Sequence, residues 1–141
     1  MSRDTDELNK IVYDALKNNA ALLIALGGDA TKIKHAGPMN LSEYPCVTYK
    51  ILGEEDNAYN SDQKSDITNT YIIVQSFSTD ASPKEVYNIN DAVFGALDGK
   101  SLSNASLLVY TAYRQLSTPV YEPSVKVWRV DATFRLVNAA L

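Results

Sequence analysis

The sequence has few of the residues that build chemical sites. Its 141 residues include one cysteine, Cys46, and one histidine, His35, so an internal disulfide is excluded and zinc has no histidine pair to bind. The 13 lysines and arginines are outnumbered by 17 aspartates and glutamates, and the net charge of −4 excludes a global basic surface for nucleic acid. We expect no metal and no cofactor.

Hydrophobic runs are also short. The longest, residues 20–26, falls far below the roughly 18 apolar residues that a membrane-spanning helix needs. The acidic first segment, MSRDTDELNK, lacks the basic and apolar regions of a secretory signal peptide. The sequence therefore predicts a cytoplasmic chain without a membrane segment.

The residues that are present fit one globular domain over residues 1–141. Hydrophobic residues make up 45% and charged residues 21%, and no repeat or long linker divides the chain. A domain of this length buries roughly 70% of its unfolded surface, which is enough for a core. The periodicity predicts the order α, short α, short β, β, β, α, β, β. This order favours an α+β fold, with a mostly antiparallel sheet of four or five strands and two main helices packed on one face.

Residues 67–99 form the central unit of the predicted fold. Alternating β-branched and aromatic residues up to Phe77 predict a central strand. Ser82, Pro83 and Glu85 then have the spacing of a capping box at a helix start, and Gly99 suits the left-handed end of that helix. Helical spacing predicts that one apolar side of this helix consists of Val86, Ile89, Val93, Ala96 and Leu97.

The N-terminal half contains weaker elements. An amphipathic stripe predicts the first helix, and a short second helix ends at Gly27-Gly28. Ile33 marks a short edge strand, and residues 46–52 alternate as a strand that is followed by a polar, acidic loop over residues 53–65. The stripe of the first helix consists of Leu8, Ile11, Val12, Ala15 and Leu16.

The C-terminal part predicts two further strands. Residues 106–116 form the first, and residues 117–124, with Pro119 and Pro123, form a rigid connection to the last strand over residues 125–137. Alternation is clearest in this last strand. One face carries Trp128, Val130, Ala132, Phe134 and Leu136, and the other carries Arg129, Asp131, Thr133 and Arg135.

The predicted sheet has more apolar surface than its helices can cover. Two modest helices cover one face, yet the strands around Val47, Ile73 and Val109 carry apolar or aromatic residues on both faces. The nine tyrosines are also typical of protein interfaces. Self-association or docking on the second face is the favoured interpretation, and the alternative is that long loops fold back over it.

Motifs for catalysis are weak. Gly99-Lys100-Ser101 resembles the end of a phosphate-binding loop, but Phe94 stands where the motif requires a glycine, and a helix has just ended there. The acidic loop lacks the ligand spacing and the glycine of a calcium loop. Cys46, at a strand start, is interpreted as a core residue. We assign no catalytic residue and expect that the protein is not an enzyme.

Three segments carry a resemblance to a known family. They are the helix IVYDALKNNAALLIALGG followed by TKIKHAGPMNLSEYPCVTYKIL, the strand and helix of YIIVQSFSTDASPKEVYNINDAVFGALDG, and the final strand VKVWRVDATFRLV. Together they resemble the tail-terminator or tail-completion proteins, also called head-tail joining proteins, of long-tailed bacteriophages. The resemblance implies a small α+β structural protein of the virion that assembles in the host cytoplasm.

The resemblance also implies partners. Such proteins form a hexameric ring at the head-proximal end of the tail tube, end tube polymerisation, and join the tail to the head connector. The tail tube protein and the connector are then the expected partners, and DNA passes through the ring without specific binding. Neighbouring subunits would cover the second face of the sheet.

Two sets of residues are candidates for ring functions, and one competing interpretation uses tyrosines. Glu54, Glu55 and Asp56 would repel DNA if their loop lines the channel, whereas an outward loop would serve only solubility. Alternating charges place Lys126, Arg129, Asp131 and Arg135 at a subunit boundary, with a solvated sheet face as the alternative. The competing function is a dimeric ligand-binding or regulatory domain with a pocket lined by Tyr49, Tyr71 and Tyr110.

Overall fold

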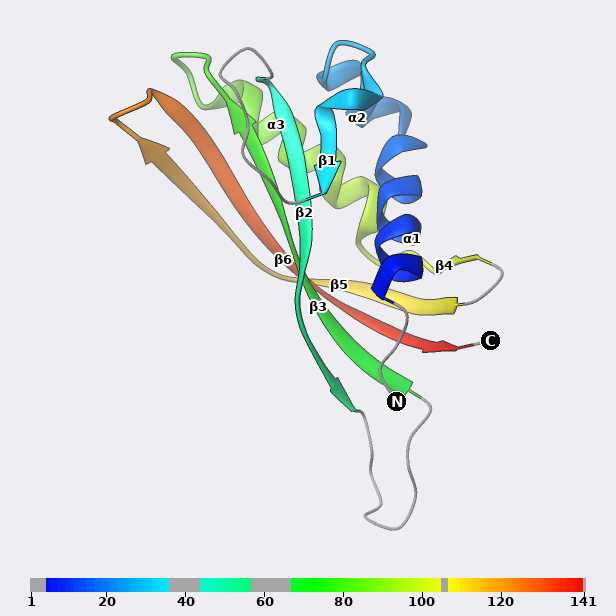
Figure 1. Cartoon of the computed structure of the whole chain (residues 1–141). Coiled ribbons are helices and arrows are strands. Elements are labelled where there is room, and N and C mark those ends of the chain that lie inside the picture. Colours follow the sequence, from blue (N-terminus) through cyan, green and yellow to red (C-terminus); the bar gives the residue numbers. More distant parts are fainter. Residues whose placement is uncertain (1–4, 36–43, 57–66, 105–106, 141) are drawn as a thin grey trace.

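The described residues fold as one twisted sheet with their α-helices on one side (Figure 1). The structure, a computed structural model, describes residues 5–35, 44–56, 67–104 and 107–140. The helical elements are α1 (Thr5–Lys17), α2 (Ala20–Ala25), the short 3-10 helix η1 (Ala30–Lys32) and α3 (Lys84–Leu97). The strands are β1 (Ile33–His35), β2 (Cys46–Asp56), β3 (Ile67–Ser78), β4 (Leu102–Ser103), β5 (Leu107–Glu122) and β6 (Val127–Ala140).

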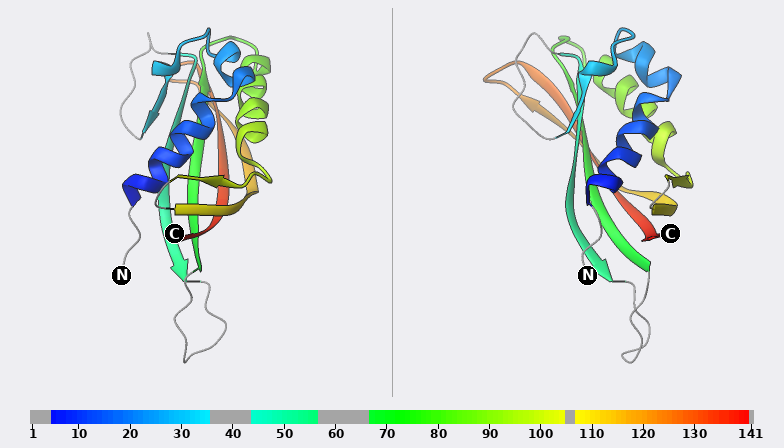
Figure 2. Two further views of the ribbon diagram at one scale, coloured as in Figure 1. Left: turned by 90° about the vertical axis from the view of Figure 1, so that its right-hand side faces the viewer. Right: turned by 45° about the vertical axis from the view of Figure 1, so that its right-hand side comes forward.

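The sheet contains six strands in the order β1-β2-β3-β6-β5-β4. β1 pairs parallel with β2, and every other neighbouring pair is antiparallel. The two views of Figure 2 show α1, α2 and α3 together on one side, while the β5–β6 hairpin projects away from the helices. The α+β class and the one-sided helix layer are thus confirmed, but the predicted four or five strands and two helices were too few.

The helices form where the sequence separates apolar from polar positions. The predicted stripe of α1 is buried at Leu8, Ile11, Val12 and Leu16, and the buried residues of α3 are the five that helical spacing predicts. After α3 the backbone turns at Gly99, whose φ of +71° is one that glycine adopts without strain. The Gly99 N–H donates to Ala112 O at 2.8 Å, so this turn also ties the helix end to β5.

The start of α3 differs from the capping box that the sequence predicts. Pro83 occupies the N-cap and provides no side-chain hydrogen bond, while Ser82 Oγ accepts from Lys84 N at 3.2 Å. Glu85 Oε1 instead accepts from Ser78 Oγ at 2.6 Å. Glu85 therefore binds the hydroxyl at the end of β3 instead of the backbone at the helix start. The prediction of a reciprocal capping box was wrong.

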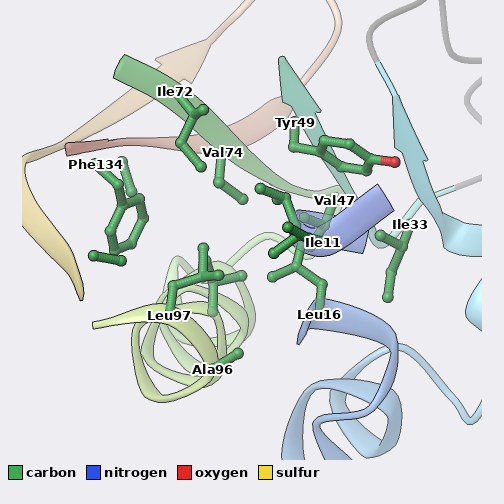
Figure 3. Packing of buried hydrophobic residues seen from close by; sticks show 14 of the residues in the cluster. Ile11, Leu16, Ile33, Val47, Tyr49, Ile72, Val74, Ala96, Leu97 and Phe134 are labelled. Carbon is green, nitrogen blue, oxygen red and sulfur yellow. The ribbon is translucent and has the colours of Figure 1, made fainter. Parts of the chain in front are cut away.

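The core lies between the helices and the facing side of β2, β3 and β6. Figure 3 shows Ile72, Val74 and Phe134 pointing from the sheet toward Leu97 of α3 and Leu16 of α1. All five side chains are 0% or 1% exposed. Because burial of apolar surface is the main favourable term in folding, this layer positions every other feature of the molecule.

Long-range pairing extends the strands beyond their predicted ends. β5 continues through Pro119 to Glu122, where the sequence predicts a proline-rich connection, because nearly every residue of that segment pairs with β6. Proline is tolerated there since this part of β5 lies on the edge of the sheet. β2 likewise continues to Asp56 by pairing with β3, so Glu54, Glu55 and Asp56 belong to a strand, and their placement in a loop was wrong. Residues 57–66 of the predicted loop lie outside the described residues.

Candidate assembly surface

The side of the sheet without helices is the most distinctive surface of the described chain. We call it the helix-free face. On β6, Arg129, Asp131 and Arg135 alternate with the buried Val130 and Phe134 and therefore lie on this face, as the sequence predicts.

The pairing register places apolar and charged residues in rows across the helix-free face. One row runs from Lys50 of β2 through Ile73 and Thr133 to Leu116 of β5. Leu116 is 63% exposed, and Ile73 is half-buried. Thr133 lies between these two apolar residues, so the row offers apolar surface on either side of a threonine.

The neighbouring row runs from Tyr71 through Arg135 to Tyr113. The Arg135 guanidinium carbon lies 5.0 Å from the centre of the Tyr113 ring, which is within the range of a cation–π contact. Arg135 Nε is buried without a hydrogen-bond partner. Arginine between two tyrosines is a composition enriched at the centres of protein interfaces.

A chain of polar contacts crosses the same face near the hairpin. Arg129 Nη1 donates to Glu122 Oε1 at 3.0 Å, and Arg129 Nε lies 2.8 Å from Asp131 Oδ1, an ion pair without hydrogen-bond geometry. Gln75 Nε2 donates to the same Asp131 oxygen at 3.0 Å. Arg129 and Asp131 are thus held by partners within their own subunit, whereas no ion pair forms at Arg135 within the described residues. The sequence did not reveal Gln75 or Glu122, because their contribution depends on strand pairing.

Part of the helix-free face is covered from within the chain. Cys46 and Val127 are 0% and 2% exposed, and the ring of Tyr44 lies 5.8 Å from that of Phe77, which pairs with Cys46. Cys46 is therefore a core residue, as expected. At this end Tyr44, which precedes β2, packs on Phe77 of the helix-free face, whereas Leu116 stays exposed within the described residues.

Lys126 does not lie on the helix-free face with the arginines. It precedes β6 in the turn of the β5–β6 hairpin, has a φ of +55°, and is exposed. The prediction that placed it within the last strand was wrong by two residues, because β6 begins at Val127 rather than at Val125.

The acidic residues at the end of β2 separate across the sheet. Glu55 accepts a 3.5 Å contact from the Tyr71 hydroxyl, which places it on the helix-free face. Glu54 pairs in register with Thr70, a residue of the opposite face, and Asp56 is the last residue of the strand. A strand therefore distributes neighbouring charges to both sides, which the loop interpretation did not anticipate.

The three tyrosines of the competing interpretation do not form one pocket. Tyr49 is 7% exposed and pairs with Val74 on the helix-covered face, whereas Tyr71 lies on the helix-free face and Tyr110 is 48% exposed. Tyr49 instead contacts Tyr13 and His35, with ring centres 6.4 Å and 5.4 Å away, beside a pocket of about 340 Å³. Burial there raises the pKa of the Tyr49 hydroxyl, and Tyr13 and Asp14 raise it further.

A second surface feature lies on the helix side. A groove of about 690 Å³ runs between α2 and the start of α3, and Ile24 of α2 is 79% exposed at its edge. The sequence contained a signal for it, since Ile24 lies out of phase with the buried Leu22 of α2 and with Leu26, the buried C-cap of that helix. A hydrophobic residue outside the buried stripe is a candidate for an external contact.

The described residues bring together no cluster of three or more potential metal ligands. Nor does any helix among them have the length and apolarity to cross a membrane. The fold and the helix-free face define the class: a small α+β domain whose distinctive surface is suited to contact with other protein subunits.

The comparisons with known proteins give the family. The sequence profile of the family described as tail completion protein gp17 matches residues 10–138, so the chain belongs to that family. It is a structural tail protein of the bacteriophage type, and the family is structural rather than catalytic. The resemblance found in the sequence is thereby confirmed.

A solved structure shares the fold. A chain from the "Virion of native gene transfer agent (GTA) particle" superposes with a TM-score of 0.78 over 99% of each chain, at 17% sequence identity. At this identity the likeness shows the fold alone. No curated protein sequence matches the chain significantly.

Proposed function

We propose that the protein forms a hexameric ring at the head-proximal end of a phage-type tail tube. There it ends polymerisation of the tube and presents the surface that joins the tail to the head connector. The supporting observation, beyond membership of a tail-completion family, is the helix-free face. There Leu116 and Tyr113 are exposed, Ile73 is only half-buried, and Arg135 has no ion-pair partner in the described part of the chain.

The two edges of the sheet support a head-to-tail contact. Within the described residues, β1 pairs with β2 only at residues 47–49, and β4 pairs with β5 only at Leu108 and Val109. The remainder of β2 and the end of β5 are thus open edges at opposite sides of the sheet. Because these edges belong to different strands, a contact between them is heterologous, and heterologous contacts close rings when the rotation permits.

The acidic end of β2 fits a channel through which DNA passes. Glu55 lies on the helix-free face, and in our proposal this end of the sheet borders the lumen of the ring. Carboxylates at that position repel phosphate and keep DNA from adhering. In our proposal the Arg129–Asp131 pair does not contact a neighbour. It stabilises the helix-free face from within the subunit, and Arg135 makes the contact with the neighbouring subunit.

The first experiment determines the assembly. Size-exclusion chromatography with light scattering on concentrated protein, followed by negative-stain imaging of the main peak, is expected to show a hexameric ring with a central hole. A compact dimer without a hole would contradict the proposal. A monomer that stays monomeric after it is mixed with preformed tail tubes would contradict it as well.

A second experiment tests the channel. Particles that carry Glu54→Lys, Glu55→Lys and Asp56→Lys together are expected to retain DNA or release it slowly, because added lysines attract phosphate. The measurement is the rate of DNA release from purified particles.

A charge-matched control separates channel effects from a general change of charge. It places lysines on and directly after α1 instead, through Asp6→Lys, Asn9→Lys, Asp14→Lys and Asn18→Lys, which together change the charge by the same amount and do not line the α2–α3 groove. DNA release at the wild-type rate from both variants would show that the end of β2 does not border the channel. That result would not contradict the proposed ring.

A further inference from the structure

The groove between α2 and α3 is lined by alanines, which we call its floor, and by carboxylates, which we call its rim. Ala21 and Ala25 of α2 face Ala92 of α3 across it, with Ile24 at the edge. The full lining consists of Ala21, Ile24, Ala25, Asp80, Ser82, Lys84, Glu85, Asn88, Asp91 and Ala92. Small residues on both helices leave room for an inserted side chain, and the exposure of Ile24, 79%, leaves a large apolar surface in water.

The charge of the groove selects what can enter it. Asp80, Glu85 and Asp91 contribute three carboxylates against the single ammonium of Lys84. Asp80 is engaged with the Ser82 N–H and Glu85 with Ser78 Oγ, whereas Asp91 is exposed and has no ion-pair partner within the described residues. The groove therefore favours a segment that combines an apolar side chain with a positive charge.

The tip of the β5–β6 hairpin in the same chain has that chemistry. Val125 is 50% exposed, and the adjacent Lys126 is exposed and has no ion-pair partner in the described part of the chain. Both residues lie in the turn between β5 and β6, where Lys126 adopts a φ of +55°. The turn therefore presents one apolar and one basic side chain at the end of a long, paired hairpin.

The tip and the groove lie at the same end of the molecule but on opposite sides of it. Figure 1 and the right-hand view of Figure 2 show the orange hairpin projecting to one side and α2 lying on the other. A hairpin so placed points away from the groove of its own subunit. In a head-to-tail arrangement, two different surfaces of neighbouring copies meet, as a projecting tip and a groove would.

We infer that the hairpin tip of one copy, Val125 and Lys126, inserts into the α2–α3 groove of the next copy. Val125 packs against Ile24 and the alanines of the floor, and Lys126 pairs with the carboxylates of the rim, Asp91 among them. This inference rests on the proposed ring and names a specific contact between its subunits. The contact is heterologous, because tip and groove are different surfaces.

A charge-swap experiment tests the pairing. Lys126→Glu is expected to raise the dissociation constant between copies at least about fivefold, because it places a carboxylate against the acidic rim. Combining it with Asp91→Lys is expected to restore most of the loss. The matched control, Lys100→Glu, makes the same charge change beyond the other end of α3 and is expected to leave assembly unchanged.

Cysteine cross-linking tests the contact directly, in a Cys46→Ala background. Two single variants, Ile24→Cys and Val125→Cys, are mixed and oxidised. The mixture is expected to form a disulfide-linked pair on non-reducing gels, while neither variant does so alone. A mixture of Lys100→Cys with Val125→Cys is the control and should stay unlinked.

The outcomes separate this inference from the proposed ring. Rings that assemble but give no Ile24–Val125 cross-link, with Lys126→Glu assembling as well as the wild type, would overturn the groove contact and leave the ring standing. Cross-linking of the Ile24 variant to a different virion protein instead of Val125 would also overturn it. Absence of any multimer, alone or on tail tubes, would count against the ring itself.

Discussion

The same alternating pattern of residues leads to different environments on the two faces of the sheet. On the helix-covered face, Val74 and Phe134 are 0% exposed and form the core. On the helix-free face, one residue away along each strand, Ile73 is half-buried and Thr133 pairs with an exposed Leu116. Apolar character in a strand therefore reports burial only where a second layer packs on that face. Where the described residues provide no such layer, as at Leu116, our proposal assigns the cover to a neighbouring subunit.

The largest effect is expected on the covered face. Phe134→Ala should lower the free energy of unfolding by about 3–5 kcal/mol, because it leaves a cavity where the ring is fully enclosed. Chemical denaturation measures this change. The matched variant, Thr133→Ala, alters the next residue on the other face and should cost less than about 1 kcal/mol. Similar losses in both variants would show that the faces do not differ in this way.

Substitutions on the helix-free face are expected to affect assembly rather than the stability of the subunit. Leu116→Glu is expected to weaken self-association roughly 10- to 100-fold while the melting temperature of the monomer stays nearly constant, since the exposed leucine loses burial only in the assembly. Light scattering over a dilution series measures the shift. Gln115→Glu adds the same charge at the preceding exposed position and serves as control. Unchanged assembly of the Leu116 variant would remove this residue from the contact.

Two arginines on the same face should behave differently. Arg129→Ala removes contacts to Glu122 and Asp131 and should destabilise the isolated subunit by about 1 kcal/mol. Arg135→Ala should leave subunit stability almost unchanged but weaken assembly. Charge reversal at both, Arg129→Glu with Arg135→Glu, should abolish the oligomer at low salt. An unaltered oligomer in that double variant would contradict a role of this face in assembly.

The smallest effect concerns Tyr49 on the covered face. Burial raises the pKa of its hydroxyl above the ordinary value, so the folded state holds this proton more tightly than the unfolded state. The resulting stability is present below about pH 10 and is lost as the pH rises through the folded pKa. Tyr49→Phe should therefore lose less stability than the wild type between neutral pH and pH 11. Urea titrations at both pH values measure this loss of stability. An equal loss in the wild type and in Tyr49→Phe would show that Tyr49 does not contribute to the pH dependence.

Several parts of the fold could be predicted because they depend on local pattern. The buried positions of α3, such as Ile89 and Val93, follow from helical spacing, and the two faces of β6 follow from alternation at Arg129 and Val130. Local patterns failed at strand ends. Proline at position 119 and the acidic Glu54 both indicate loops in isolation, yet long-range pairing extends a strand through each.

The candidate assembly surface also combines features that local pattern predicts with features that depend on contacts between distant segments. Alternation alone placed Arg129, Asp131 and Arg135 on one face of the last strand. It could not show that Arg129 and Asp131 are held by Glu122 and Gln75, because those partners come from β5 and β3. Nor could it separate Tyr49 from Tyr71, since the assignment of a strand face to helix or solvent depends on where the helices pack.

The α+β class, the buried stripe of each main helix and the two faces of the last strand follow from the amino-acid sequence, because each depends on the spacing of nearby residues. The tail-completion family follows from segments along most of the chain. The folded structure adds that β6 lies between β3 and β5, that Lys126 stands at a hairpin tip rather than on the helix-free face, and that α2 and α3 enclose an acidic groove. These features join segments far apart in the chain. Packing and strand register fix such contacts, and no local period encodes them.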